Sequence, residues 1–294
     1  MQATQPLFAE RSWTSHDGLR LFARDYAAAG GPARCPVICI HGLTRNSADF
    51  DDVAPWIAAL GRRVLAVDVR GRGRSQYDPD SSHYTPTVYA RDIIDLAESL
   101  GIARAVFIGT SMGGIITMTL ALKRSSLIAA AVLNDVGPFI SQTGLNRIAG
   151  YVGQGQALAS WDDAAAYSQR INGYAFPDYT MDDWMKWSRR TFTQDADGKF
   201  VLQYDPGIAL AVRKGDIKTT SWIARLAFRR LASQRPTLLV RGALSDLVEA
   251  EQAERMRASA PTLQYCEVPG VGHAPMLMEP EAQSALRRFL GEVP

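Results

Sequence analysis

The strongest indication of the fold is the stretch Val106-Phe107-Ile108-Gly109-Thr110-Ser111-Met112-Gly113-Gly114, in which a strand-like run leads straight into a sharp turn. Residues 109–113 match the pattern G-x-S-x-G, in which the serine sits on a strained strand-to-helix turn with its hydroxyl exposed. The glycines lack a Cβ, so they let the strand and the helix crowd the serine, and they accept unusual backbone angles. An apolar run at 105–108 and a helix-forming run at 115–123 flank the turn, as the pattern requires.

Short β-branched runs alternate with helical patterns along most of the chain. We predict near-continuous apolar strands at 36–40, 64–67, 105–108, 128–133, 237–240 and 263–268, with a possible edge hairpin strand at 19–26. We predict helices at 53–60, 86–100, 112–123, 250–258 and 279–290. This alternation is typical of an α/β fold in which a mostly parallel sheet is covered by crossover helices.

The alternation stops between about residues 137 and 232. That stretch holds helical segments, an acidic and aromatic patch at residues 182–187 and a turn at 195–198, but no convincing parallel strand. We therefore predict a core made of residues 1–136 and 233–294, with residues 137–232 inserted as a mainly helical cap.

Composition excludes several partner classes. The 294 residues carry a net charge of only +2, so nothing indicates a polyanionic partner such as a nucleic acid. Arg70, Arg72 and Arg74 form a local basic run, which we interpret as a solvated loop or a structural salt-bridge set. No apolar run approaches the ~18 residues that span a bilayer, so we expect no membrane partner.

The cysteines and histidines indicate a cytoplasmic protein without a metal. Residues 1–13 show no secretory signal pattern. If Cys35 and Cys39 share one strand they lie about 13 Å apart, too far for a disulfide, so we expect Cys35, Cys39 and Cys266 to be reduced and buried. Four histidines without H-x-x-x-H spacing, and the lack of C-x-x-C, predict no metal site.

Serine needs an imidazole to take its proton and a carboxylate to orient that imidazole. In the fold that carries G-x-S-x-G, the chain order is Ser, then Asp or Glu, then His. Ser111, Asp246 and His273 follow this order, and the last two lie on loops directly after predicted strands. Asp135, immediately after the strand at 128–133, is the rival of Asp246 as the orienting acid.

A tetrahedral intermediate also needs backbone donors for its oxyanion. Met112 follows the nucleophile at a helix N-terminus and supplies one N–H. The second is expected from the loop after residues 36–40, where Leu43 is the candidate. His41 at the start of that loop is better interpreted as an anchor of the loop than as a ligand.

Together these motifs resemble the α/β-hydrolase fold family with a helical cap. The matching pieces are His41-Gly42, residues 68–75 (DVRGRGRS), the turn at 109–114, residues 242–246 and Gly272-His273, which span nearly the whole chain outside the cap. The resemblance implies that Ser111, His273 and Asp246 form a triad, with Leu43 and Met112 as the oxyanion hole. It implies no cofactor.

We expect a serine hydrolase that cleaves a small or medium, largely apolar carboxylic ester or lactone through an acyl-enzyme. The substrate-binding residues expected from the cap are Trp184, Trp187, Tyr174 and Trp222, because ligand sites are concave and rich in aromatic groups. Such a protein is expected as a monomer or homodimer with a small-molecule substrate.

Three alternatives stay open. The family includes hydrolases of carbon–carbon bonds in ring-cleavage products, but the loop at 43–47 lacks their Ser-Gly-Pro-Gly-like sequence. Enol-lactone hydrolysis fits the serine turn equally well. A receptor that binds a small ligand on the same fold would also be compatible with these residues. Ser111 argues against the epoxide hydrolases and haloalkane dehalogenases of the family, whose nucleophile is an aspartate.

Overall fold

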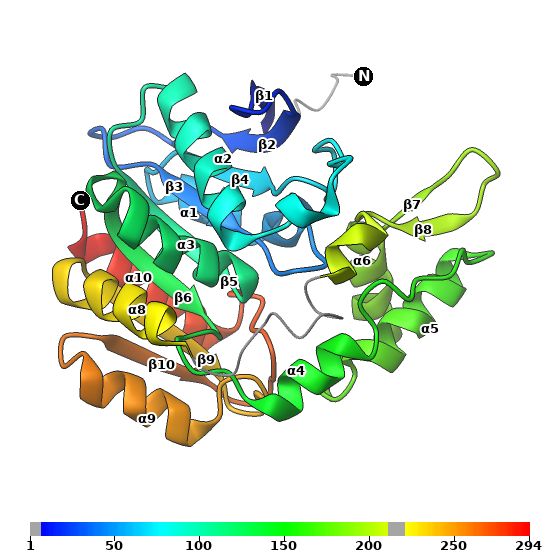
Figure 1. The fold of residues 1–294 in the computed structure, drawn as a ribbon. Coiled ribbons are helices and arrows are strands. Elements are labelled where there is room, and N and C mark those ends of the chain that lie inside the picture. The colour runs from blue at the N-terminus through cyan, green and yellow to red at the C-terminus, as the bar shows by residue number, and fades with distance from the viewer. Residues whose placement is uncertain (1–6, 211–220) are drawn as a thin grey trace.

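The structure, a computed structural model, describes residues 7–210 and 221–294. An eight-stranded sheet in the order β1-β2-β4-β3-β5-β6-β9-β10 forms its centre (Figure 1). The strands are β1 (Ala9–Thr14), β2 (Arg20–Tyr26), β3 (Val37–Ile40), β4 (Val64–Asp68), β5 (Ala105–Thr110), β6 (Ile128–Asn134), β9 (Thr237–Gly242) and β10 (Gln264–Val268). The β1/β2 and β2/β4 pairs are antiparallel and all other pairs are parallel. The predicted α/β fold is confirmed.

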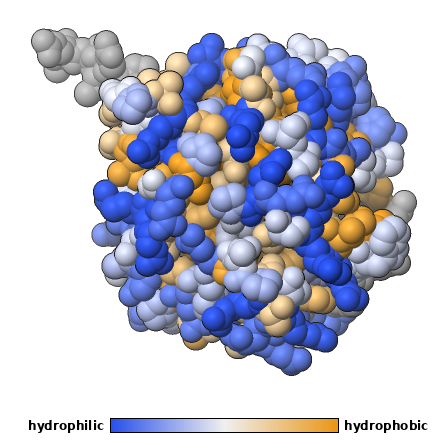
Figure 2. Space-filling model, turned by 90° about the vertical axis from the view of Figure 1, so that its left-hand side faces the viewer, coloured by the Kyte–Doolittle hydropathy of each residue, from blue (hydrophilic) through white to orange (hydrophobic). Residues whose placement is uncertain are grey.

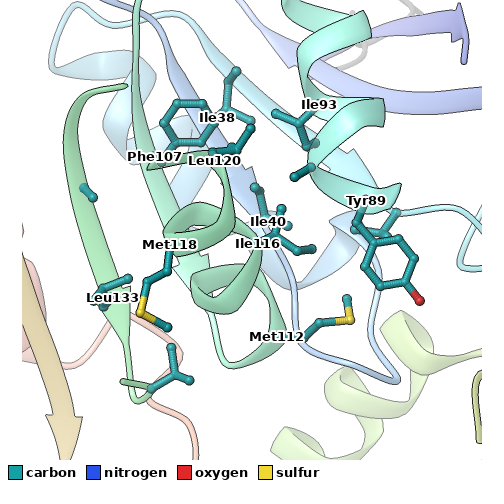
Figure 3. Packing of buried hydrophobic residues seen from close by; sticks show 14 of the residues in the cluster. Ile38, Ile40, Tyr89, Ile93, Phe107, Met112, Ile116, Met118, Leu120 and Leu133 are labelled. Carbon is teal, nitrogen blue, oxygen red and sulfur yellow. The ribbon is translucent and has the colours of Figure 1, made fainter. Parts of the chain in front are cut away.

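Helices cover both faces of this sheet (Figure 1). The core helices are α1 (Val53–Ala59), α2 (Pro86–Ser99), α3 (Met112–Lys123), α8 (Trp222–Gln234), α9 (Ala250–Ser259) and α10 (Pro280–Glu292). Buried residues of α2, α3, α8 and α9 belong to one apolar cluster, and those of α1 and α10 belong to a second. Figure 3 shows side chains of α2, α3 and the strands meeting in the first cluster.

The central strand β3 is apolar at every position because both of its faces are covered. In β3, Ile38 and Ile40 join the first cluster while Val37 and Cys39 join the second. Successive side chains of a strand point to opposite faces, so a strand between two helical layers needs an apolar residue at each position. The edge strand β1 is mostly exposed, and buried and exposed residues do not alternate regularly along it. For this reason the sequence pattern did not predict it.

The segment after β6 holds α4 (Gln142–Ala149), α5 (Trp161–Asn172), α6 (Met181–Thr191) and a hairpin of β7 (Phe192–Gln194) and β8 (Phe200–Leu202). Short 3-10 turns lie at Ser47–Phe50, Ser81–His83, Ser125–Leu127 and Pro206–Ile208. Helix α6 begins with a capping box between Thr180 and Asp183, which satisfies backbone N–H groups at its first turn. The predicted boundary at residue 232 falls inside α8, whose Phe228 and Leu231 are buried in the first core cluster with α3.

The basic run at 70–74 divides between the interior and the surface. Arg70 is fully buried and pairs with Asp17, Asp78 and Asp92, so its interpretation as part of a salt-bridge set is confirmed. Arg74 pairs with Glu10 in an exposed position. On the face drawn in Figure 2, hydrophilic and hydrophobic residues are interspersed.

Two further expectations concern cysteines and membranes. All three cysteines are free, and Cys39 is buried while Cys35 and Cys266 are half-buried. Among the helices of residues 7–210 and 221–294, none combines the length and the apolar character that crossing a membrane requires.

Candidate active site

Ser111 lies on the turn between β5 and α3 in a conformation that few residues adopt. Its backbone has φ 53° and ψ −115°, a sparsely populated region that persists only where the surroundings enforce it. The Ser111 N–H donates to the carbonyl of Asn134 at 2.9 Å, which ties the turn to the end of β6. A Cβ on Gly113 would collide with the carbonyl of Ile40, so the close approach of α3 to β3 requires glycine there.

His273 bridges Ser111 and a carboxylate. Its Nε2 lies 2.9 Å from Ser111 Oγ, and its Nδ1 lies 2.8 Å from Asp135 Oδ2. Because an ionised carboxylate only accepts hydrogen bonds, Nδ1 carries a proton and Nε2 is free to accept the hydroxyl proton of Ser111. The fold therefore brings together the predicted nucleophile, Ser111, and the predicted base, His273.

Asp135 is held rigidly behind His273. It is fully buried and has φ 54°, a backbone conformation that Asp tolerates better than most residues. Its N–H donates to Val240 O at 2.7 Å, and its carboxylate accepts Gly242 N–H at 3.1 Å and Ser245 Oγ–H at 2.6 Å. These bonds fix the carboxylate that orients the imidazole.

Asp246 forms no hydrogen bond or ion pair with His273, which corrects the prediction that it orients the imidazole. Its carboxylate instead accepts two hydrogen bonds from Arg147 of α4, at 2.6 and 2.8 Å. Burial alone would raise the pKa of Asp246, but the bonds and charge of Arg147 outweigh burial and hold that pKa below its usual value. The rival residue Asp135 takes the position because β6 ends beside β9, and the loop after β9 directs Ser245 toward the carboxylate of Asp135.

The two predicted oxyanion donors lie beside the serine. Met112 is the first residue of α3, so its N–H is at the helix N-terminus. A Cβ on Gly42 would lie 3.7 Å from Ser111 Cβ, which places the loop carrying Leu43 against the nucleophile. Leu43, Ser111 and Met112 line the same cavity.

His41 anchors this loop, as its position suggested. Its Nδ1 lies 2.7 Å from Gly42 O, and its Nε2 accepts the N–H of Val69 at 3.1 Å. Burial lowers the pKa of His41 to about 3, so the ring is neutral at pH 7. The fixed neutral ring holds the loop after β3 against the loop after β4.

The cavity at Ser111 has a volume of about 570 Å³, within the range of small-molecule sites. The core contributes Tyr84, Tyr89 and Met118, and α4 contributes Leu145 and Ile148. None of its lining side chains, within the described part of the chain, is charged. An uncharged, largely apolar wall favours an apolar acyl or alkyl group beside the serine.

The four aromatic residues predicted to bind substrate lie outside the lining of this cavity. Trp184 and Trp187 are buried against Phe176 in the core of the inserted segment. Trp222 is 73% exposed at the start of α8. Tyr174 is half-exposed, with the Arg147 guanidinium 4.2 Å from its ring centroid. The lining that the inserted helix α4 contributes includes Leu145 and Ile148, which no sequence motif predicted.

Within residues 7–210 and 221–294, two groups of side chains have the geometry to hold a metal ion: His16, Asp17 and Asp92, and Asp17, Asp78 and His83. All three of these carboxylates already bond the buried guanidinium of Arg70. That ion pairing accounts for the cluster without a metal.

Comparison with known proteins identifies the family of this chain. A model of the alpha/beta hydrolase family matches residues 37–286. The chain belongs to the alpha/beta hydrolase family. An alpha/beta hydrolase of known crystal structure from Novosphingobium aromaticivorans DSM 12444 is 41% identical and superposes with a TM-score of 0.90, covering 98% of this chain and 99% of that one. Members of this family share the fold and differ in the reaction they catalyse.

Among characterised relatives, a 3-hydroxybutyrate-oligomer hydrolase from Cupriavidus necator is 36% identical over 89% of this chain and 90% of its own length. A 2-(acetamidomethylene)succinate hydrolase from Mesorhizobium japonicum is 29% identical over 83% of this chain and 84% of its own. The names of both relatives describe hydrolases, so this alpha/beta hydrolase has hydrolytic enzymes among its relatives.

Proposed function

We propose that this alpha/beta hydrolase cleaves a small or medium carboxylic ester through an acyl-enzyme. The observation that carries the proposal is the hydrogen-bonded chain from Ser111 Oγ through His273 to Asp135. This chain opens at Ser111 into an uncharged cavity. The orienting acid in the proposed triad is Asp135, not Asp246.

In the first step Ser111 Oγ forms a bond to the ester carbonyl carbon and passes its proton to His273 Nε2. The carbonyl π electrons move onto its oxygen, and the N–H groups of Leu43 and Met112 bind the resulting oxyanion. Collapse restores the carbonyl and expels the alkoxide, which takes the proton from His273. Water then repeats these two steps on the acyl-enzyme and releases the acid.

The lining of the cavity and one relative support an ester as the substrate. Apolar walls beside Ser111, such as Ile115 and Met118, suit the hydrocarbon part of an acyl group. Oligomers of 3-hydroxybutyrate are joined by ester bonds, and the relative named for them covers most of this chain. We therefore include short hydroxyacyl esters in the proposed substrate class.

The test uses 4-nitrophenyl esters of two to twelve carbons, together with a 3-hydroxybutyrate dimer. The wild-type protein is expected to release a burst of 4-nitrophenol followed by steady turnover, the kinetic sign of an acyl-enzyme. Ser111→Ala should abolish both while keeping the fold, and Ser99→Ala is the matched control, since its hydroxyl bonds Leu96 O at the end of α2.

Turnover that survives Ser111→Ala would refute the serine mechanism. Absence of turnover on every ester, with cleavage of a lactone or a carbon–carbon substrate, would replace the ester proposal by one of those reactions. Tight binding of small ligands without any cleavage would favour the receptor alternative.

A further inference from the structure

Arg72 contacts both residues whose N–H groups are the proposed oxyanion donors, Leu43 and Met112. Its guanidinium is fully buried, and Nε donates to the carbonyl of Leu43 at 3.0 Å. One terminal nitrogen lies 3.5 Å from the sulfur of Met112, and the other donates to Tyr89 Oη at 2.9 Å. Figure 3 shows Tyr89 and Met112 near the same end of the neighbouring helices α2 and α3.

The partners of Arg72 are all uncharged. Besides these contacts it donates to the carbonyl of Arg70 at 2.8 Å, and it lies 5.0 and 5.5 Å from the ring centroids of Tyr89 and Tyr84. Across residues 7–210 and 221–294, no carboxylate forms an ion pair with it. Its neighbour Arg70, by contrast, has three carboxylate partners.

A buried charge without a counterion is costly, so its retention needs a reason. Carbonyl, hydroxyl and thioether dipoles solvate the Arg72 cation but do not cancel its charge. The field of a charge in a poorly solvated interior reaches several ångströms with little screening. The nearest place where negative charge develops in the proposed reaction is the oxyanion bound by Leu43 and Met112, both of which Arg72 contacts.

We infer that Arg72 is a positioning residue of the oxyanion hole, whose uncompensated positive charge stabilises the tetrahedral intermediate. This inference rests on the proposed serine hydrolase function. The hydrogen bond to Leu43 O holds the loop in the orientation that presents the Leu43 N–H. The charge acts most strongly when the oxyanion forms, so it assists the transition state more than the ground state.

The test compares two probes of the same size. Propylboronic acid accepts the lone pair of Ser111 Oγ into its empty boron orbital while the hydroxyl proton passes to His273, which gives a tetrahedral anion. Butyramide is neutral and resists hydrolysis, so its inhibition constant reports ground-state binding. Arg72→Gln is expected to weaken boronate inhibition about 30-fold and kcat/KM similarly, while the butyramide constant changes less than about 3-fold.

Arg62→Gln is the matched control. Arg62 is also a fully buried guanidinium, and it donates to the backbone carbonyls of Leu290 in α10 and of Val293. It does not line the cavity at Ser111. Its replacement is expected to lower the melting temperature without changing the ratio of the two inhibition constants. A merely structural role for Arg72 would give the same pattern as Arg62.

Arg72→Lys keeps the charge with a different shape and is expected to bind the boronate within about 5-fold of wild type. This variant also decides the question if Arg72→Gln does not fold. A folded Arg72→Lys that loses more than 10-fold in boronate affinity, or a folded Arg72→Gln that loses none, would overturn the inference while leaving Ser111-dependent turnover intact. A wild-type protein with neither boronate binding nor Ser111-dependent turnover would instead refute the proposed function, and the inference with it.

Discussion

Arg147 holds Asp246 by two hydrogen bonds, from Nε at 2.6 Å and from a terminal nitrogen at 2.8 Å. This pair joins α4 of the inserted segment to the loop after β9. Because the two oxygens of Asp246 are occupied by a guanidinium, the residue that looked best placed to orient His273 has another role. The imidazole is oriented by Asp135, whose chain position is more than 100 residues earlier.

Replacing the two aspartates separately tests this assignment. Asp135→Asn should reduce kcat/KM on a 4-nitrophenyl ester by about 10³- to 10⁴-fold, because the amide no longer fixes the His273 tautomer or stabilises the imidazolium. Asp246→Asn should cost less than about 5-fold, because its carboxylate bonds Arg147. Steady-state measurement of kcat/KM for both purified variants tests which aspartate orients His273. An equal loss in the two variants would contradict the assignment.

The crowded turn at Ser111 should tolerate no side chain at residue 113. Gly113→Ala pushes a Cβ into the carbonyl of Ile40, so we expect the free energy of unfolding to fall by about 2 kcal/mol or more. Gly291→Ala in α10 is the control: nothing lies within 4 Å of a Cβ there, and alanine favours a helix by about 0.5–1 kcal/mol. Urea denaturation of both variants measures the difference.

His41 should make the fold sensitive to acid. Burial lowers its folded-state pKa to about 3, below the unfolded value of about 6.5. The unfolded chain therefore binds the extra proton, so this contribution to stability is present above pH 6.5 and is lost as the pH falls toward 3. Between pH 7 and pH 5, the wild type should lose about 2 kcal/mol more than His41→Gln.

Glutamine at residue 41 can still accept the N–H of Val69, so the comparison isolates the titration of the imidazole. Denaturant unfolding at the two pH values, on both proteins, gives the difference directly. Parallel acid sensitivity of the two proteins would show that carboxylates elsewhere account for it.

Two of the tryptophans predicted to bind substrate, Trp184 and Trp222, should not affect chain-length preference. Trp184 is 1% exposed, so Trp184→Ala is expected to cost about 3–5 kcal/mol. Trp222 is 73% exposed, so Trp222→Ala should change stability by less than about 0.5 kcal/mol. Neither lines the cavity at Ser111, so the preferred ester length should stay that of wild type. A shifted length preference in Trp222→Ala would place that residue at the substrate.

Local sequence determined the fold and half of the candidate site. Fully apolar runs such as 36–40 require cover on both faces, and the glycines around Ser111 are needed wherever a helix packs this closely on a strand. Ser111, Met112 and the loop of Leu43 could be predicted because the backbone conformation at each depends on residues adjacent to it in the chain. The edge strand β1 was missed because its exposed positions carry little apolar pattern.

Only the tertiary structure decided the choice between Asp135 and Asp246, the residues that line the cavity, and the surroundings of Arg72. Both aspartates follow neighbouring strands, so their chain positions are equivalent, and a guanidinium from α4 determines which one remains for His273. Arg70 and Arg72 likewise look alike in sequence, yet only Arg70 meets carboxylates. Such outcomes depend on side chains that folding brings together from distant parts of the chain, and no local pattern records them.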